Sequence, residues 1–285
     1  MPGAADVLRL HPEWYHSIEL APGVVTPGRA PLAFWEEELR AIALPDLSGR
    51  SVLDIGAYDG FFSFAAERRG AARVVALDHY AWFTDMPAYM QEWREAQQAG
   101  RFLPPPHLTG HWRPDELPGR RPFEAARAAL GSTVEAVARD FMTTGPADIG
   151  TFDVVLFLGV LYHLEEPLTA LRRVFALTAP GGRCVIETEA MEIPGSGRRA
   201  LCEFFPGDEL NGDASNWWAP NRAALVGLCQ AAGFASVEVL PERQPLSLAR
   251  RAGKLAKNRV ARVPFSGVAR RYRLVVHAMR AAQPG

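Results

Sequence analysis

The sequence is short of cysteine and has no long apolar run, and each shortage excludes a class of protein. Its cysteines, Cys184, Cys202 and Cys229, are odd in number and form no C-x-x-C pair, which argues against a disulfide framework or a zinc site. No stretch approaches the roughly 18 apolar residues of a membrane span, and the first residues lack a basic region followed by an apolar core. We therefore expect a soluble, cytoplasmic protein without a metal site.

Acidic residues are absent from the last part of the chain. The net charge of −1 over 285 residues gives no global field for nucleic acid or membrane, but no Asp or Glu follows Glu242, whereas Lys and Arg recur from Arg243 to Arg280. Such a run is usually a solvated helical face. Spaced cations could also follow an RNA backbone, although Phe265 and Tyr272 are the only aromatic residues there for base stacking.

One stretch organises the rest of the sequence. An apolar run over residues 51–55 stops at Gly56, a second glycine follows at Gly60, and helical spacing begins at Phe61. This order predicts a strand, a tight turn and a helix whose first N–H groups are free to bind a ligand. A second strand, from Arg73, ends in Asp78, at a spacing that lets an acid bind both hydroxyls of a ribose.

The turn lacks the middle glycine of a dinucleotide site. Tyr58 stands in its place, and Asp59 adds an acid that would repel a diphosphate. S-adenosylmethionine (SAM), with its sulfonium and ammonium groups, suits the loop better. The pattern D-x-G-x-x-x-G followed by a strand ending in an acid resembles the class I SAM-dependent methyltransferases. The resemblance implies cofactor contacts from Asp54, Gly56, Ala57, Tyr58, Gly60 and Asp78.

Strands and helices alternate along the chain, which indicates an α/β fold: a doubly wound, mainly parallel, seven-stranded Rossmann-like sheet. We expect an N-terminal lid over residues 1–47 and a methyltransferase core over 48–240 with a substrate cap inserted at about 80–131. The basic segment, 241–285, would complete the sheet. Residues 179–182 read as a turn before a strand over 183–187, and 236–240 with 273–277 as a terminal hairpin.

Ligands of such sheets lie at the carboxyl ends of the strands. The fold implies that Arg139 and Asp140 contact the adenine and that Leu158 lies beside the cofactor. His163 is the candidate general base, since imidazole titrates near neutrality; a structural hydrogen bond in its turn is the alternative. All tryptophans fall outside the predicted strands, where they could line a substrate pocket or join cap to core. The candidates for acceptor binding are Tyr15, His16, Trp112, Glu187, Trp217 and Trp218.

A narrower resemblance covers about residues 48–240. The segments 158–163 (LGVLYH), 167–168 (PL) and 205–209 (FPGDE) are similar to the family of the bacterial tRNA wobble-uridine methyltransferase that makes 5-carboxymethoxyuridine. The resemblance implies that Tyr162 contacts the cofactor. That enzyme uses carboxy-SAM and has arginine directly after its Tyr-His pair. Here Leu164 and Glu165 follow, and an acid would repel a carboxylated cofactor.

We therefore expect a SAM-dependent methyltransferase that acts on an oxygen, or a nitrogen, of a small metabolite in natural-product or sugar biosynthesis. The first alternative is a tRNA wobble-uridine enzyme that uses carboxy-SAM and binds nucleic acid through the basic C-terminal run. The second is a SAM-binding protein without catalysis. The expected partner is a small-molecule acceptor and no membrane, and a homodimer is left open.

Overall fold

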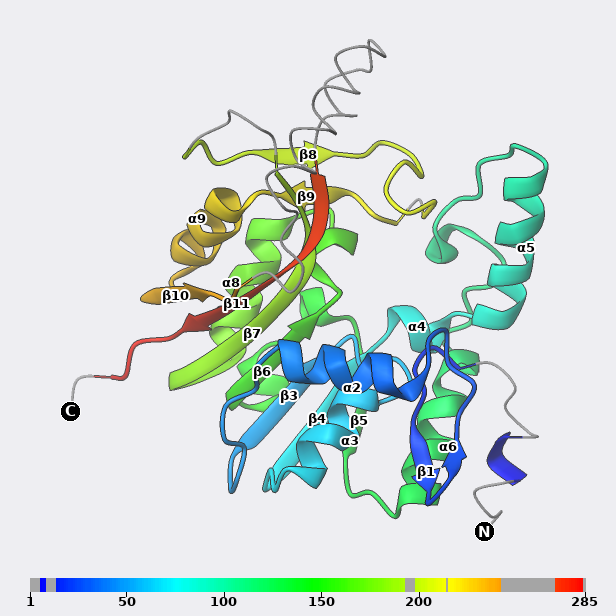
Figure 1. The fold of residues 1–285 in the computed structure, drawn as a ribbon, viewed down its shortest axis with the longest axis horizontal. Helices are drawn as coiled ribbons and strands as arrows, with labels where there is room; N and C mark the ends of the chain where they lie inside the picture. Colours follow the sequence, from blue (N-terminus) through cyan, green and yellow to red (C-terminus); the bar gives the residue numbers. More distant parts are fainter. Residues whose placement is uncertain (1–5, 9–13, 193–197, 214, 242–269, 284–285) are drawn as a thin grey trace.

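A seven-stranded sheet forms the centre of the molecule. The computed structural model describes residues 6–8, 14–192, 198–213, 215–241 and 270–283 (Figure 1). The strand order is β10-β11-β7-β6-β3-β4-β5. Strands β3 to β7 are mutually parallel, whereas β11 is antiparallel to both of its neighbours. The predicted doubly wound, mainly parallel sheet is thus confirmed. Its strands are β3 (Ser51–Ile55), β4 (Arg73–Asp78), β5 (Glu135–Ala138), β6 (Phe152–Leu158), β7 (Thr178–Glu192), β10 (Ser236–Val239) and β11 (Arg270–Met279).

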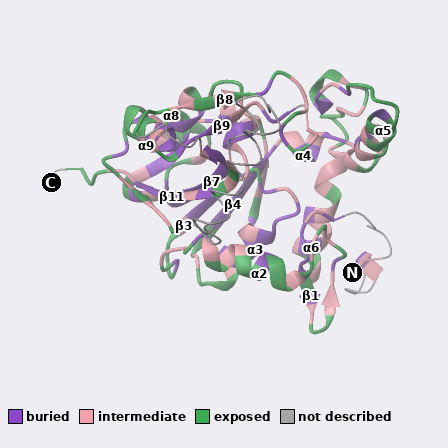
Figure 2. Cartoon of the chain, turned by 45° about the horizontal axis from the view of Figure 1, so that its top comes forward, coloured by how far each residue is buried: buried purple, intermediate pink, exposed green. Residues whose placement is uncertain are grey.

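Helices cover both faces of this sheet because successive strand residues point to opposite sides. In β3, Val52 packs with the face that carries α2, α3 and α6, and Leu53 packs with the face that carries α8 and α9. The central strands are buried on both faces (Figure 2). These helices are α2 (Leu32–Ala41), α3 (Phe61–Arg68), α6 (Arg121–Leu130), α8 (Pro167–Leu177) and α9 (Arg222–Ala232).

The expected turn over residues 179–182 lies inside a strand, so that prediction was wrong. Phe152 pairs with Thr178 and Val154 with Arg183, which leaves the residues between them as a bulge in β7. At its other end β7 runs past the predicted limit because β11 pairs with it as far as Glu192. Antiparallel pairing with a distant segment lengthened the strand, and local spacing carried no signal of it.

Two segments stand over the carboxyl ends of the parallel strands. The cap insertion, residues 80–131, follows β4 and contains α4 (Tyr80–Phe83) and α5 (Met86–Gln98). The late segment, residues 201–221, follows β7 and contains the hairpin of β8 (Cys202–Phe204) and β9 (Trp218–Pro220). The two are joined: Trp93 Nε1 donates to the Gly212 carbonyl at 2.6 Å, and Gln97 donates to Asp208 at 2.7 Å.

The N-terminal segment, residues 14–28, forms the small hairpin of β1 (Glu19–Ala21) and β2 (Val24–Val25). Short helices complete the chain: η1 (Pro106–Leu108), η2 (Pro118–Arg120), η3 (Phe141–Thr143), α7 (Pro146–Ile149) and η4 (Leu161–His163). In the described ranges no helix is both long and apolar enough to cross a membrane.

The described arginines of the basic run have partners within the fold. Arg280 donates to carbonyls at the end of α8, at 3.0 Å from that of Phe175. Arg271 donates to the Glu209 carbonyl at 3.0 Å, and its guanidinium lies 4.7 Å from the ring centre of Phe205. These cations hold the sheet edge together. Residues 242–269, which carry the first part of the basic run, lie outside the described chain.

Candidate active site

The loop after β3 is shaped by its two glycines. Gly56 (φ 78°) and Gly60 (φ 89°) both have left-handed backbone, which costs glycine little. A Cβ on Gly56 would lie 2.6 Å from a methyl of Val160, and one on Gly60 would lie 2.5 Å from the ring of Phe64. Conformation and close packing therefore both require glycine. Between them, Tyr58 also adopts positive φ, at 52°.

Asp78, at the end of β4, is tied to this loop. One carboxylate oxygen accepts the Tyr58 N–H at 2.9 Å, and the other accepts the Ala81 N–H at 2.9 Å. Trp82 Nε1 closes the loop from outside by donating to the Tyr58 carbonyl at 2.6 Å. Burial raises the pKa of Asp78 to about 6, against the effect of the backbone N–H donors. Its carboxylate keeps lone pairs that a ribose diol could use.

Asp54 holds the fold rather than reaching into the loop. Its carboxylate accepts the Ser63 hydroxyl at 2.6 Å, so it fixes α3 to β3. Burial raises the pKa of Asp54 to about 6, and the Ser63 hydrogen bond opposes that shift. Ala57, directly after β3, is buried, and Leu158 ends β6, the neighbouring strand. Asp54, Ala57 and Leu158 all lie beside the loop, and their cofactor contacts stay predictions.

Asp59 anchors the N-terminal segment. It is fully buried and accepts the backbone N–H groups of Tyr15 and His16 at 3.0 and 2.7 Å. Its other oxygen bonds Nδ1 of His16. Asp59, which we expected to repel a diphosphate, thus binds the N-terminal segment through hydrogen bonds. His16, a predicted acceptor ligand, is buried in this contact.

Tyr15 faces the site from the same segment. Its ring centre lies 4.8 Å from that of Tyr58. Burial raises the pKa of Tyr15, while the charges of Arg29 and Arg273 lower it. Tyr15 therefore packs on the cofactor loop through the ring of Tyr58.

The predicted adenine contacts separate in the structure. Asp140 accepts the Met142 N–H at 2.8 Å and lies 3.7 Å from Nε2 of His79, at the end of β5 next to β4. Arg139 instead pairs with Asp148 at 2.9 Å, and 58% of its side chain is exposed. Its guanidinium is engaged on the surface, and its contact with the adenine stays a prediction.

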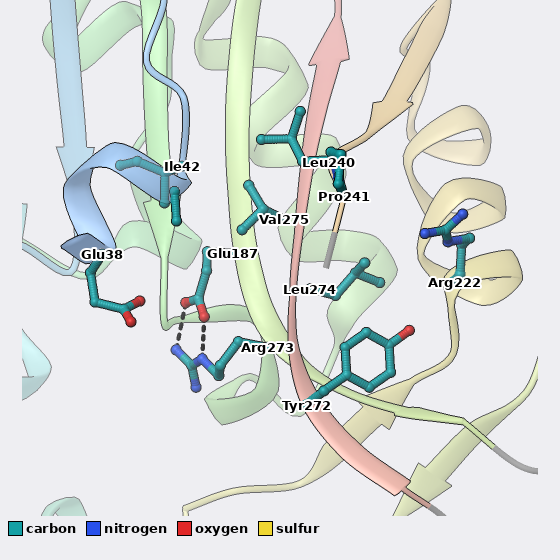
Figure 3. A pocket seen from close by; sticks show the side chains of 11 residues that line it. Glu38, Ile42, Glu187, Arg222, Leu240, Pro241, Tyr272, Arg273, Leu274 and Val275 are labelled. Carbon is teal, nitrogen blue, oxygen red and sulfur yellow. Dashed lines mark hydrogen bonds and ion pairs between the residues drawn. The ribbon is translucent and has the colours of Figure 1, made fainter. Parts of the chain in front are cut away.

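A charged cluster lies over the end of β6. The Arg273 guanidinium binds both carboxylate oxygens of Glu187 (Figure 3). It also lies 3.1 Å from Glu189. It also donates to the Tyr162 hydroxyl at 3.2 Å and lies 5.1 Å from the centre of that ring. Burial raises the pKa of Glu187, and Arg273 opposes that shift. A small pocket beside the cluster is lined by the end of α2, with Glu38 and Ile42, and by β7 and β11.

The sequence did not single out Arg273. The signal was its register. Arg273 pairs with Glu189, and Glu187 pairs with Val275, two residues further along a stretch of β11 that is apolar from Leu274 to Val276. That register is known only once the antiparallel pairing of β11 with β7 is known.

His163 lies between two tyrosine rings. Its ring centre is 4.3 Å from that of Tyr162 and 6.3 Å from that of Tyr80. Nδ1 lies 2.9 Å from the Ser215 hydroxyl and 3.1 Å from the Ser215 carbonyl oxygen. Burial lowers the pKa of His163, with Asp213 as the largest opposing influence. A neutral imidazole at neutral pH follows.

The predicted tryptophans occupy different places. Trp112 packs on Tyr80, with ring centres 6.1 Å apart, and so reaches His163 through that ring. Trp217 donates its backbone N–H to the Tyr162 carbonyl at 2.7 Å, but its ring stacks on Phe204 of β8. Trp218 packs on the same Phe204. Trp217 and Trp218 therefore support the hairpin behind Tyr162, and Trp112 packs on Tyr80, the other tyrosine beside the candidate base.

Within the described residues, no group of three or more His, Cys, Asp or Glu side chains is arranged to hold a metal ion. The glycine loop with an acid at the end of the next strand, on a sheet whose last strand is reversed, defines a class I SAM-dependent methyltransferase. The chain belongs to the family described as "Methyltransferase domain", which matches residues 29–239. It is an enzyme whose cofactor is SAM.

Several curated relatives share one name. The chain is 28% identical over 218 residues to the tRNA U34 carboxymethyltransferase of Chromohalobacter salexigens, a match over 75% of this chain and 53% of that protein. It is 27% identical over 203 residues to the enzyme of the same name from Psychrobacter cryohalolentis, over 71% of this chain and 48% of that protein. The chain therefore spans about half the length of these relatives.

Solved structures agree on the fold. The N-terminal domain of EvdMO1 with SAH bound has a TM-score of 0.56 at 19% identity and covers 97% of this chain and 95% of that one. An O-methyltransferase family protein from Burkholderia thailandensis has a TM-score of 0.50 at 13% identity, over 89% of this chain and 57% of that one. The residues present fit SAM, because Asp78 keeps lone pairs for the ribose hydroxyls and its carboxylate lies against the backbone of the glycine loop.

Proposed function

We propose that this enzyme methylates a hydroxyl oxygen of a small metabolite, with a nitrogen as the other acceptor atom, in natural-product or sugar biosynthesis. The observation that carries the proposal is His163, whose Nδ1 is hydrogen-bonded to Ser215 and whose pKa is lowered by burial. SAM supplies a methyl group already activated by its sulfonium. The protein must then orient the acceptor and accept its proton, the step in which a neutral imidazole helps a hydroxyl most.

The covered edge of the sheet favours a small acceptor. Asp59 holds the N-terminal segment over the loop, and Trp93 and Gln97 join the cap insertion to the late segment. In this proposal residues 1–47 are the lid, 80–131 the cap and 241–285 the segment that completes the sheet of the core. Tyr15, Trp112 and Glu187 would bind the acceptor, while Gly56, Tyr58, Gly60, Asp78 and Asp140 bind SAM.

The charged cluster favours SAM over carboxy-SAM. Arg273, next to Tyr162, already faces the two carboxylates of Glu187 and Glu189. A cofactor with an additional carboxylate would meet a cluster with a formal charge of −1, and Glu165 follows close behind His163 in the chain. Like charges in a partly buried site repel more strongly than in water.

The names of the relatives favour a second candidate, a tRNA wobble-uridine enzyme that uses carboxy-SAM. In that case the basic run from Arg250 to Arg273 would bind the RNA backbone. Such binding depends strongly on salt, since each phosphate contact releases counterions.

Calorimetric titration of the purified protein separates the two. We expect tight binding of SAM, much weaker binding of carboxy-SAM, and no change when bulk tRNA is added in low salt. Methyl transfer from labelled SAM to a panel of hydroxylated aromatic and sugar-like compounds would then identify the acceptor class. Preference for carboxy-SAM, or tRNA binding that weakens steeply with salt, would overturn the small-metabolite proposal.

A further inference from the structure

A chain of hydrogen bonds reaches His163 from the late segment. The Ser215 hydroxyl donates to Oδ1 of Asp213 at 2.7 Å, and the Ser215 N–H donates to the same oxygen at 2.9 Å. Ser215 in turn holds Nδ1 of His163 through its hydroxyl at 2.9 Å and its carbonyl at 3.1 Å. Asp213 thus fixes the rotamer of Ser215, and Ser215 fixes the ring of His163.

The donors and acceptors in this chain determine the tautomer. A carbonyl oxygen can only accept, and the Ser215 hydroxyl has given its proton to Asp213, so towards His163 it also accepts. Both partners of Nδ1 therefore require that Nδ1 carry the proton. The lone pair of the neutral ring then lies on Nε2, which has no hydrogen-bond partner among the described residues.

Ser215 and His163 differ in how far they are buried. Ser215 is 4% exposed, whereas His163 is only partly buried. The hydrogen-bonded side of the imidazole is sealed, and the remaining nitrogen is the one that can meet a ligand. Tyr162, whose hydroxyl is bound by Arg273, adjoins the same ring.

We infer that Asp213 and Ser215 are positioning residues, which present Nε2 of His163 to the acceptor hydroxyl. This inference rests on the proposed function. In the transfer, the acceptor oxygen gives its proton to Nε2 and forms the new O–C bond, while the electron pair of the broken S–C bond stays on sulfur. The positive charge moves from the sulfonium to the imidazolium, and the Asp213 carboxylate stabilises it through Ser215.

The sequence places these groups far apart: Ser215 is 52 residues from His163. Other charged and titratable groups also act on the ring, namely Arg273 and Glu189 from the sheet edge, with Tyr162 and Tyr80 on its two sides. Among these groups, Asp213 is the one that Ser215 links to Nδ1 by hydrogen bonds. Its effect on the imidazole therefore depends on Ser215, whereas the effects of the other groups do not.

The tautomer can be measured without turnover. In protein labelled with ¹⁵N-histidine and free of cofactor, the ring nitrogen shifts of His163, assigned with His163→Asn, report which nitrogen is protonated. We expect Nδ1–H in the wild type, a shift of population towards Nε2–H in Ser215→Ala, and an intermediate result in Ser215→Cys, which keeps the size but weakens the hydrogen bonds. Nε2–H in the wild type, or no change in Ser215→Ala, would overturn the inference.

Kinetics then test the positioning role. Asp213→Asn and Ser215→Ala should lower kcat about 10- to 100-fold with little change in KM for SAM, because a misplaced base loses part of its contribution. Asp213→Asn should also move the acidic limb of the pH profile to lower pH, since Asp213 raises the pKa of His163. Glu209→Gln, which removes an exposed acid from the same segment, is the matched control and should leave both kcat and the pH profile unchanged. Unchanged kcat in both variants, with the tautomer shifted, would overturn the role in catalysis.

Failure of the proposed function can be distinguished from failure of this inference. If the wild type transfers no methyl group to any small hydroxyl compound while the tautomer responds to Ser215→Ala, the Asp213–Ser215–His163 chain stands and the acceptor class is wrong. Circular dichroism of each variant identifies misfolding, and Ser215→Cys provides a second variant of nearly unchanged volume.

Discussion

The cofactor loop and the charged cluster are assembled by different parts of the chain. Asp78 binds the backbone of Tyr58, which is 20 residues away in sequence. Arg273 binds Glu187 over 86 residues, and His163 reaches Ser215 over 52. One side of the site is a local strand-turn-helix unit held mainly by backbone donors. The other exists only when distant strands and the late segment have come together, so cofactor binding and acceptor chemistry should be separable by mutation.

The largest effect should come from His163→Asn, the sharpest test of this separation. We expect kcat to fall by about 10² to 10⁴, the usual contribution of a general base, with the Kd for SAM unchanged. Steady-state kinetics and calorimetry on the same preparation give both values. His107→Asn, in the exposed part of the cap insertion, is the matched control. Equal losses in kcat and in SAM affinity would show that the two sides are not independent.

Asp78→Asn probes the opposite side. An amide cannot accept from the Tyr58 and Ala81 N–H groups and also from two ribose hydroxyls, so SAM should bind about 10- to 100-fold more weakly. Calorimetry measures the change, with the exposed Asp115→Asn as control. Unaltered SAM affinity would remove Asp78 from the cofactor site.

Replacement of Asp54 should change the pH dependence of the free energy of unfolding. Burial raises its folded-state pKa to about 6 from an ordinary value of 3.8, so its contribution to the free energy of unfolding is full below about pH 4 and is lost as pH rises through 6. As pH falls from 7.5 to 4.5, the free energy of unfolding of the wild type should rise by about 2 kcal/mol relative to that of Asp54→Asn, measured by urea unfolding.

Asp153 provides the control of opposite sign. The Ser51 N–H and hydroxyl bind its carboxylate and lower its pKa, so its contribution is lost as pH falls. The difference in the free energy of unfolding between Asp153→Asn and the wild type should therefore become smaller at acidic pH. If the stability difference from the wild type changed with pH in the same direction for both variants, the pKa of Asp54 would not be raised by burial.

The smallest effect concerns cofactor choice. Glu189→Gln removes one of the two carboxylates that face Arg273, so the preference for SAM over carboxy-SAM should narrow about 3- to 10-fold, measured as the ratio of the two Kd values. Glu192→Gln, which removes an equal charge further along β7, should leave the ratio unchanged. An unchanged ratio in Glu189→Gln as well would mean that the cluster does not select the cofactor.

The same contrast explains what could be predicted from the sequence. The strand of Asp54, the turn at Gly56 and Gly60, and the strand ending in Asp78 follow from local spacing, and all are confirmed. The fold class follows from the alternation of strands and helices. Arg273 and Ser215 could not be found, because their partners depend on β-strand register and on the path of a loop rather than on neighbouring residues.

Contacts that the sequence did not predict come from the same source. Asp59 was interpreted by its charge alone, and its partners, the N–H groups of Tyr15 and His16, come from 43 to 44 residues earlier. Trp217 and Trp218 were predicted to bind the acceptor from their residue type, and their packing on Phe204 could not be read from the sequence; their role in acceptor binding stays a prediction. Residue type and spacing indicate what a side chain can do, whereas long-range pairing decides whether it is free to do it.

The Asp59 anchor bears on the order of events in a catalytic cycle. The loop that carries Tyr58 towards the cofactor also fastens the segment that crosses over it, through the next residue in the chain. A movement that frees one disturbs the other. We therefore expect entry of the cofactor and departure of the spent nucleoside to be coupled to the docking of Tyr15 and His16, a step distinct from methyl transfer itself.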